Sequence, residues 1–269
     1  MPQRRPLRFR EGRVTVSPFD QLVQRHQGDS LLSIDLTEQL HVHGRNLTRY
    51  LEQVGRPRSP KGRALLTAAR LAEEFPGTAE ELCALTHDTP FQLLAATILS
   101  AQCTDVRVNL VTPALFAAYP DAAALARARP DDVEELVRTT GFFRAKTRSL
   151  IGMAQAVQDR FEGTVPTELS DLVTIPGVGR KTGNVLRSVD FDLPGLPVDT
   201  HVLRISHRLG LTGATDPVKV EHALNAMIPG PERGVFSLRV ILHGRATCTA
   251  RRPHCVTCPL ADFCPSYEV

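Results

Sequence analysis

The chain has 269 residues, 42% of them hydrophobic, with a formal net charge of +3 and a pI near 8.6. This length allows a large core in one or two domains, and no apolar run is long enough to span a bilayer, which excludes a membrane-spanning protein. No signal peptide is recognisable, so we expect the six cysteines to be thiols or metal ligands rather than disulfides.

Positive charge is concentrated at the N-terminal end. Lys and Arg outnumber Asp and Glu by 13 to 6 through Arg70, and residues 4–13 alone carry five arginines. Such a segment can lie along phosphates, or it can simply keep a chain in solution. A mitochondrial transit peptide is disfavoured by the early Glu11 and Asp20. We therefore interpret residues 1–60 as a basic extension of unknown role.

From residue 61 onward the pattern is almost wholly helical, without sustained period-two alternation, and it predicts an all-α fold. An opening helix is predicted over residues 61–75. Thr89 and Pro90 supply an N-cap and a proline at the first helical position of a second, over residues 91–103. That helix is apolar nearly all round, which predicts a place in the core. Further helices are predicted over residues 105–119, 130–139, 144–161, 167–174 and 179–189, with another from Pro197 and one ending at Gly244.

The stretch IPGVGRKTGN, residues 175–184, predicts a tight hairpin between two helices. Glycine accepts the backbone geometry that such a turn requires. The free amides of the hairpin and the N-terminus of the second helix form an anion site, and nucleic-acid phosphate is the anion that suits it. The residues expected to bind the DNA backbone here are Gly177, Val178, Gly179 and Arg180.

Lys181 lies in the first turn of that second helix. The positive end of the helix dipole disfavours an ammonium there, and partial burial would disfavour it further, so the amine could act as a nucleophile. Asp199 lies at the expected start of the next helix. An amine that attacks carbon and a carboxylate that stabilises positive charge can together break a sugar–base bond. On these residues alone, a solvated lysine and a helix cap are the more ordinary interpretation, and the hairpin would then be a nonspecific DNA-binding module.

Four cysteines near the C-terminus are separated by six, two and five residues: Cys248, Cys255, Cys258 and Cys264. Four thiolates so close together can hold one metal centre, either an iron–sulfur cubane or a structural zinc. Zinc ribbons more often pair two distant CxxC motifs, and only one CxxC occurs here, so the spacing favours iron–sulfur. A loop held in this way would present Arg251 and Arg252 as a stiff phosphate clamp.

The motifs IPGVGRKTGN, PVDTH and C-x6-C-x2-C-x5-C, in this order, resemble the endonuclease III family of DNA glycosylases in the helix-hairpin-helix superfamily. The resemblance begins near Lys61 and reaches the C-terminus. It implies two lobes: a six-helix domain over residues 83–193 and a [4Fe-4S] cluster domain built from residues 61–82 and 194–269. It also implies a bifunctional glycosylase and abasic-site lyase that acts on oxidised pyrimidines in duplex DNA, with Lys181 as the nucleophile and Asp199 as the essential carboxylate.

The resemblance also assigns DNA contacts. Gln102, in the segment SAQCTD, would fill the hole left by a flipped nucleotide. The loop after the glycine of TTGFFRAK would supply an apolar wedge, Phe142, and a phosphate contact, Lys146. His201 and Arg204 would support the site or the backbone contacts. The more familiar pattern has leucine then tyrosine where this chain has two phenylalanines, a departure that bears on lesion preference.

Two alternatives remain open from the sequence. A monofunctional mismatch glycosylase can share the cluster, but that class generally lacks the lysine. A noncatalytic DNA-binding or redox-sensing protein would grip phosphates with the hairpin and use the cluster to report oxidation. For the bifunctional enzyme we expect a monomer in a bacterial cytoplasm, at the nucleoid, with duplex DNA containing damaged pyrimidines or abasic sites as its partner and no membrane association.

Overall fold

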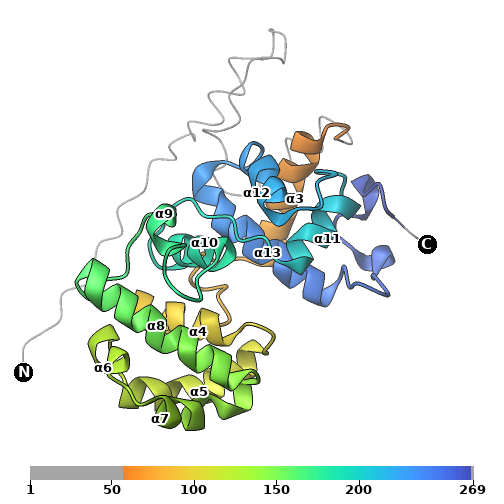
Figure 1. Ribbon diagram of the computed structural model, residues 1–269. Helices are drawn as coiled ribbons and strands as arrows, with labels where there is room; N and C mark the ends of the chain where they lie inside the picture. The colour runs from red at the N-terminus through yellow and green to blue at the C-terminus, as the bar shows by residue number, and fades with distance from the viewer. Residues whose placement is uncertain (1–56, 268–269) are drawn as a thin grey trace, which may run out of the picture. The chain divides into compact units, whose positions relative to one another are not determined.

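Residues 57–267 are described by the structure, a computed structural model of the chain (Figure 1). They lie within one unit of the fold, and the extension predicted over residues 1–60 falls almost entirely outside them. The described residues contain helices and no strand, so the predicted all-α class is confirmed. None of the helices between residues 57 and 267 is long and apolar enough to cross a membrane.

The α-helices follow one another with short connections. In chain order they are α3 (Pro60–Glu74), α4 (Pro90–Leu99), α5 (Asp105–Ala118), α6 (Ala122–Ala126), α7 (Pro130–Val137), α8 (Phe143–Phe161), α9 (Leu169–Leu172), α10 (Arg180–Val189), α11 (Thr200–Arg208), α12 (Pro217–Asn225) and α13 (Arg233–Ala246). The helix predicted over residues 167–174 is only the short α9. Helices α6 and α12 were not predicted.

The start of α4 follows its sequence signal, and its end does not. Thr89 caps the helix by accepting a hydrogen bond from the amide of Gln92, and Pro90 occupies the first turn. The helix ends at Leu99, and it cannot extend to the predicted residue 103 because Gln102 has a positive φ of 52°. A right-handed helix cannot continue through a left-handed residue.

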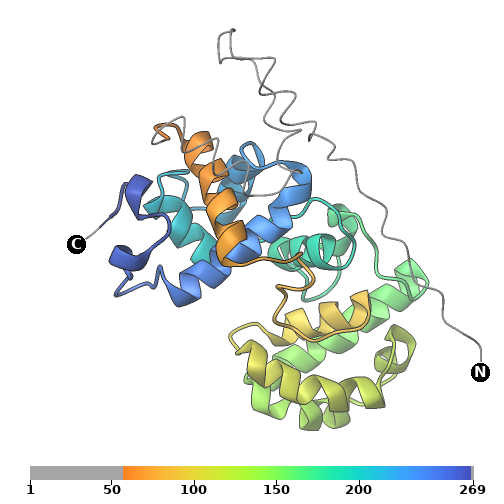
Figure 2. The ribbon, with the colours of Figure 1, turned by 180° about the vertical axis from the view of Figure 1, so that it is seen from behind.

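Two clusters of buried side chains form separate cores. The first centres on α4 and α8, and its fully buried members include Leu94, Leu150 and Met153. The second centres on α13, where Phe236 and Val240 pack with residues of α3, α11 and α12. Figures 1 and 2 show α3 beside α13, although the two helices are far apart in the sequence. Domain limits at residues 83 and 193 stay a prediction.

Helix α13 does not stop at Gly244, as was predicted, but continues to Ala246. This glycine is needed for packing. A Cβ added there would lie 2.9 Å from Cδ1 of Ile205 and 3.1 Å from Cβ of His201, both on α11. The missing side chain lets α11 approach α13 closely.

The other end of α13 has a similar close contact with α10. A Cβ on Gly234 would lie 2.2 Å from Cβ of Ser188, far inside van der Waals contact. Helix α13 therefore lies directly against the helix that carries the predicted nucleophile in its first turn and against the helix capped by the predicted carboxylate. Its two glycines set how closely each can approach.

A buried ion pair holds the far end of α10. His87, which precedes α4, places Nε2 3.2 Å from Oδ1 of Asp190 and Nδ1 2.7 Å from the carbonyl oxygen of Leu85. The side chains of His87 and Asp190 are 8% and 12% exposed. Both ring nitrogens face acceptors, an arrangement that only the doubly protonated imidazolium can satisfy. The hydrogen bond to Asp190 accordingly raises the pKa of His87.

This pair predicts a pH-dependent stability. A folded-state pKa above the unfolded value of about 6.5 gives a stabilisation that is complete below that pH and is lost as the pH rises through the folded-state pKa. We expect the free energy of unfolding of the wild type to exceed that of His87→Gln most at low pH, and the difference to shrink above about pH 6.5. Urea unfolding at several pH values measures it. A difference that grows with pH would contradict the assignment.

Candidate active site

The hairpin between α9 and α10 has the geometry that its glycines allow. Gly177 has a φ of 80°, and a Cβ there would lie 2.8 Å from Cβ of Ser149 on α8. Val178 is only 6% exposed, and its amide donates to the carbonyl oxygen of Ile175 at 3.0 Å. The amide and the side chain of Val178 are both used inside the protein, which corrects its predicted role as a DNA contact.

The start of α10 leaves backbone donors free. Gly179 is extended and caps the helix without any side-chain hydrogen bond. Between residues 57 and 267 no acceptor faces the amides of Arg180, Lys181 and Thr182, whereas the next amide, of Gly183, bonds back to Gly179 at 2.9 Å. Three unpaired amides at the positive end of a helix form an anion site.

Two neighbouring cations at this helix start differ in their pairing. Arg180 makes a bidentate ion pair with Glu221 of α12, with distances of 2.7 and 3.0 Å, and this hydrogen-bonded contact raises the pKa of Arg180. The ion pair uses Nε and Nη2 of the guanidinium, and 40% of the Arg180 side chain is exposed, so its contact with DNA stays a prediction. Partial burial was expected for Lys181, but the residue is exposed. No polar partner for its ammonium occurs in the described part of the chain.

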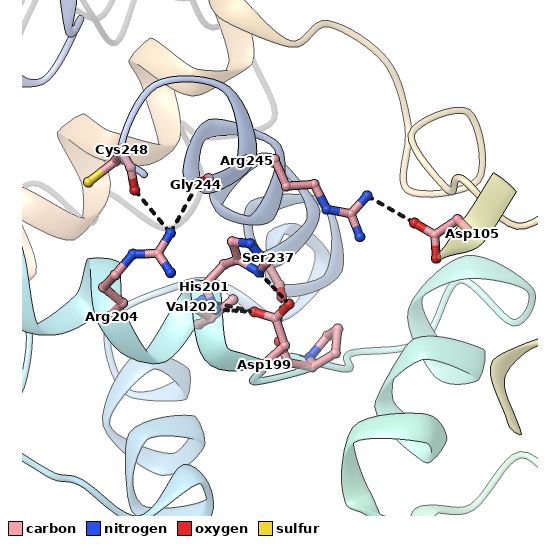
Figure 3. Close-up of polar contacts among 10 residues, drawn as sticks. Asp105, Asp199, His201, Val202, Arg204, Ser237, Gly244, Arg245 and Cys248 are labelled. Atoms are coloured by element: carbon pink, nitrogen blue, oxygen red, sulfur yellow. Dashed lines mark hydrogen bonds and ion pairs between the residues drawn. The ribbon is translucent and has the colours of Figure 1, made fainter. Parts of the chain in front are cut away.

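Asp199 is the N-cap of α11 (Figure 3). Its Oδ1 accepts hydrogen bonds from the amides of His201 at 2.8 Å and Val202 at 2.9 Å. Its Oδ2 lies 3.0 Å from Nδ1 of His201, and 18% of the side chain is exposed. The backbone fixes one carboxylate oxygen and the imidazole orients the other, while part of the side chain stays open to solvent.

The segment before Asp199 is held by α13. The hydroxyl of Ser237, which is fully buried, donates to the carbonyl oxygen of Pro197. Arg245, at the other end of α13, pairs with Asp105 at 2.9 Å and so reaches the start of α5, three residues after Gln102. One helix thus contacts both the carboxylate segment and the segment that carries Gln102.

Gln102 and Phe142 share an unusual backbone. They have φ values of 52° and 46°, and between residues 57 and 267 only Glu162 and Asp192 are other non-glycine residues with positive φ. Gln102 is exposed, and 69% of Phe142 is exposed. Large side chains held in strained conformations at the surface are a recognised feature of functional sites.

Lys146 does not lie where a phosphate contact must lie. It is 5% exposed, and its Nζ donates to the carbonyl oxygen of Thr140 at 2.7 Å. Burial lowers the pKa of its ammonium. The prediction that Lys146 contacts DNA is therefore wrong for this structure, because helix α8 turns this side chain inward.

The four C-terminal cysteines surround one pocket. It is lined by Cys248, Cys255, Cys258 and Cys264 together with Arg208, Thr247, Pro253, His254, Ala261, Ser266 and Tyr267. Burial raises the pKa of the Cys258 thiol to about 11, so metal binding has to displace a proton from it. In the described ranges, no three or more His, Cys, Asp or Glu side chains are arranged to hold a metal ion. The donor set and the shared pocket nevertheless fit a cluster bound by four thiolates.

Arg208, which was not among the predicted site residues, holds the loop that follows Cys248. Its guanidinium donates to the carbonyl oxygens of Thr249 at 2.7 Å and Ala250 at 2.9 Å, and it lies 3.2 Å from Sγ of Cys248. Positive donors beside a sulfur suit the charge of a cluster thiolate. The sequence signal was available: Arg208 follows Arg204 by four residues, which places both on one face of α11.

Arg204, one turn before Arg208 on α11, holds the same loop. It donates to the carbonyl oxygens of Gly244 at 3.0 Å and Cys248 at 2.9 Å (Figure 3). The guanidinium points at the protein backbone, which fits the predicted support of the site, and a contact of Arg204 with DNA stays a prediction. Arg251 and Arg252 are exposed, and neither side chain has a polar partner within residues 57–267, which leaves both free for phosphates.

Comparisons with known proteins agree with this geometry. Residues 95–229 match the HhH-GPD superfamily of base excision DNA repair proteins, and residues 248–264 match the iron-sulfur binding domain of endonuclease III. Endonuclease III of Synechocystis is 51% identical over 78% of this chain and 95% of its own length. The chain belongs to the endonuclease III family. It is therefore a DNA glycosylase and abasic-site lyase of base excision repair, and its cofactor is a [4Fe-4S] cluster.

Solved structures extend the likeness to complexes with DNA. A trapped covalent intermediate of endonuclease III with DNA is 38% identical, with a TM-score of 0.72, and the match covers 77% of this chain and 96% of that one. A non-covalent endonuclease III–DNA complex is 34% identical, with a TM-score of 0.69, covering 84% and 96%. The two-lobed helix-hairpin-helix glycosylase fold is confirmed, and this family member binds DNA.

The position of Arg208 predicts a role in retaining the cluster. Replacing it with methionine removes donors to two carbonyls and a sulfur, each charged hydrogen bond contributing about 1.5–3 kcal/mol. We expect Arg208→Met to lose the visible absorbance of the cluster faster in a chelator than the wild type does. Lys219→Met, which removes an exposed charge from α12, is the control. Equal rates of cluster loss in all three proteins would contradict the assignment.

Proposed function

We propose that Lys181 and Asp199 carry the glycosylase and lyase steps, and that the substrate is duplex DNA with an oxidised pyrimidine or an abasic site. The supporting observation is the contrast at the start of α10. Arg180 is neutralised by Glu221, whereas Lys181 is exposed without a partner beside three free amides. The relative whose structure is that of a trapped covalent intermediate with DNA supports a covalent step in this chain.

The first step exchanges one bond at the sugar. The damaged nucleotide is flipped out of the helix. The free amine of Lys181 attacks C1′, and the base leaves with the electron pair of the glycosidic bond and takes up a proton. Oδ2 of Asp199 faces the positive charge that develops on the sugar and accepts a proton from the attacking nitrogen. Oδ1 of Asp199 stays bound to two amides and keeps the carboxylate in place.

The second step cuts the strand. The sugar ring opens to give an iminium between C1′ and Lys181, and this positive group acidifies the hydrogens on C2′. Loss of one C2′ proton forms a double bond to C3′ as the 3′ phosphate departs, and water then releases the lysine. The strand is thus cut by β-elimination on the 3′ side of the lesion.

The remaining contacts place the DNA. The amides at the start of α10 and the free side chains of Arg251 and Arg252 suit backbone phosphates. Gln102 and Phe142 suit the gap left by the flipped nucleotide. The [4Fe-4S] cluster, bound by the four cysteines, stiffens the loop that carries the two arginines. We further propose domains divided at residues 83 and 193, and a monomer that works at the bacterial nucleoid in the cytoplasm.

Borohydride trapping of the wild type tests the proposal. Borohydride reduces the iminium to a stable amine, so a covalent protein–DNA band is expected with an oxidised pyrimidine and with an abasic site. Base release without a covalent band would indicate a monofunctional glycosylase, and mismatched duplexes would then be compared. Binding of DNA without base release or strand cutting would indicate a noncatalytic protein.

A further inference from the structure

The Phe142 loop is held in a conformation that its own residues disfavour. Phe142 is left-handed, with φ 46° and ψ 29°, and it has no side-chain cap at the start of α8. Gly141 before it has a φ of 71°, and a Cβ added to it would meet nothing within 4 Å, so no other segment packs against the loop at that point. A bulky side chain in a left-handed conformation persists only when surrounding structure fixes it.

Lys146 provides that fixation from inside the protein. Its Nζ donates to the carbonyl oxygen of Thr140, and its amide donates to the carbonyl oxygen of Phe142 at 3.0 Å. Thr140 is 2% exposed, and its hydroxyl donates to the carbonyl oxygen of Val137 at 2.8 Å. The bond to Phe142 comes from the backbone and would be made by any residue at this position, whereas the bond to Thr140, next to Gly141, depends on the lysine side chain.

Burying the ammonium of Lys146 has a free-energy cost that is unusual for a residue with only a structural role. Its ammonium is desolvated and has one carbonyl acceptor, and a buried charge with so few partners generally destabilises a fold relative to an apolar side chain of similar size. The presence of a buried ammonium at this position is better explained by the segment that it holds in place. What it holds is the loop that ends in the exposed Phe142.

We propose that Lys146 is a positioning residue for Phe142, fixing the wedge so that it enters the duplex as the nucleotide flips. The inference rests on the proposed function, because a wedge acts only if the duplex is opened. Lys146 touches neither the DNA nor Lys181 in this role. Its effect on excision passes through Phe142 alone.

Lys146→Met tests the proposal without emptying the site. Methionine is unbranched, favours helices and fills a similar volume, so folding and the cluster absorbance are expected to remain. A 2-aminopurine beside the lesion brightens when the stack opens, and it reports the wedge whether or not chemistry follows. We expect the wild type to give this signal, and Lys146→Met and Phe142→Ala to lose most of it. Arg148→Met, which removes an exposed charge from the same helix, should keep it.

Single-turnover excision on duplex DNA separates a positioning role from a general one. We expect about a tenfold loss for Lys146→Met, since unstacking a base has a free-energy cost that an ordered wedge offsets. The loss should disappear when Lys146→Met is added to Phe142→Ala, because both changes remove the same contact. Multiplicative effects, or a wild-type fluorescence signal from Lys146→Met, would overturn the proposal.

A substrate without a stack separates this inference from the proposed chemistry. Lys146→Met should trap single-stranded abasic DNA as well as the wild type does, since no wedge is needed there. A wild type that opens the duplex and does not cut would remove the proposed chemistry and keep the positioning role. A Lys146→Met variant that traps single-stranded abasic DNA poorly would count against positioning, because the defect would then lie in the chemistry.

Discussion

Lys181→Ala is expected to abolish the covalent protein–DNA band and to slow strand cutting by roughly three orders of magnitude or more, as removal of a covalent nucleophile does in other enzymes. Alanine is a strong helix former, and Lys181 is exposed without a partner, so α10 should stay folded. The three amides at the helix start remain, and DNA binding should change little. Borohydride trapping and single-turnover cutting on an abasic duplex measure the effect.

Lys219→Ala is the matched control for this change. It removes another exposed lysine, from α12, and should leave the covalent band and the cutting rate at wild-type values. Cluster absorbance and thermal unfolding show that both variants are loaded and folded. A covalent band of normal intensity from Lys181→Ala would refute the assignment of the nucleophile and would direct the search to another amine.

Asp199→Asn is expected to lower base excision by about 100-fold or more while changing stability little. Asparagine caps helices as well as aspartate does, and its carbonyl oxygen can still accept from the amides of His201 and Val202. What disappears is the negative charge that faces the sugar. Asp199→Ala should lose the cap as well, at about 1 kcal/mol of stability.

The abasic-site reaction distinguishes the proposed role of Asp199 from a loss of structure. No base has to leave an abasic site, so Asp199→Asn should retain more of its strand-cutting rate there than of its excision rate on an oxidised pyrimidine. Single-turnover rates on the two duplexes give the comparison. If both rates fall by the same factor and the melting temperature falls with them, the carboxylate is structural and the proposed mechanism is wrong.

Local sequence signals located the elements that carry the site. Thr89 with Pro90 predicted the start of α4, and the hairpin glycines predicted the start of α10. The same kind of signal, Asp216 followed by Pro217, marks the start of α12 but went unrecognised. Helix α6 has five residues, mostly alanine, and offers no periodicity to detect.

The side chains were harder to predict than the helices. The pairing of Arg180 with Glu221 joins residues 41 positions apart, and the inward turn of Lys146 depends on how α8 packs. No local pattern contains either fact. The prediction that α13 ends at Gly244 was wrong for a related reason. A glycine near the end of a helix usually terminates it, but here the glycine makes room for a neighbouring helix.

The contact between α10 and α13 also limits how this sequence can diverge. Positions 188 and 234 share one small volume, since a single methyl on Gly234 would lie 2.2 Å from Cβ of Ser188. Neither position can enlarge alone without separating the two helices. Among homologues the pair should therefore covary: alanine at position 234 should appear with glycine at position 188, and a random library of both positions should return only combinations of similar total size.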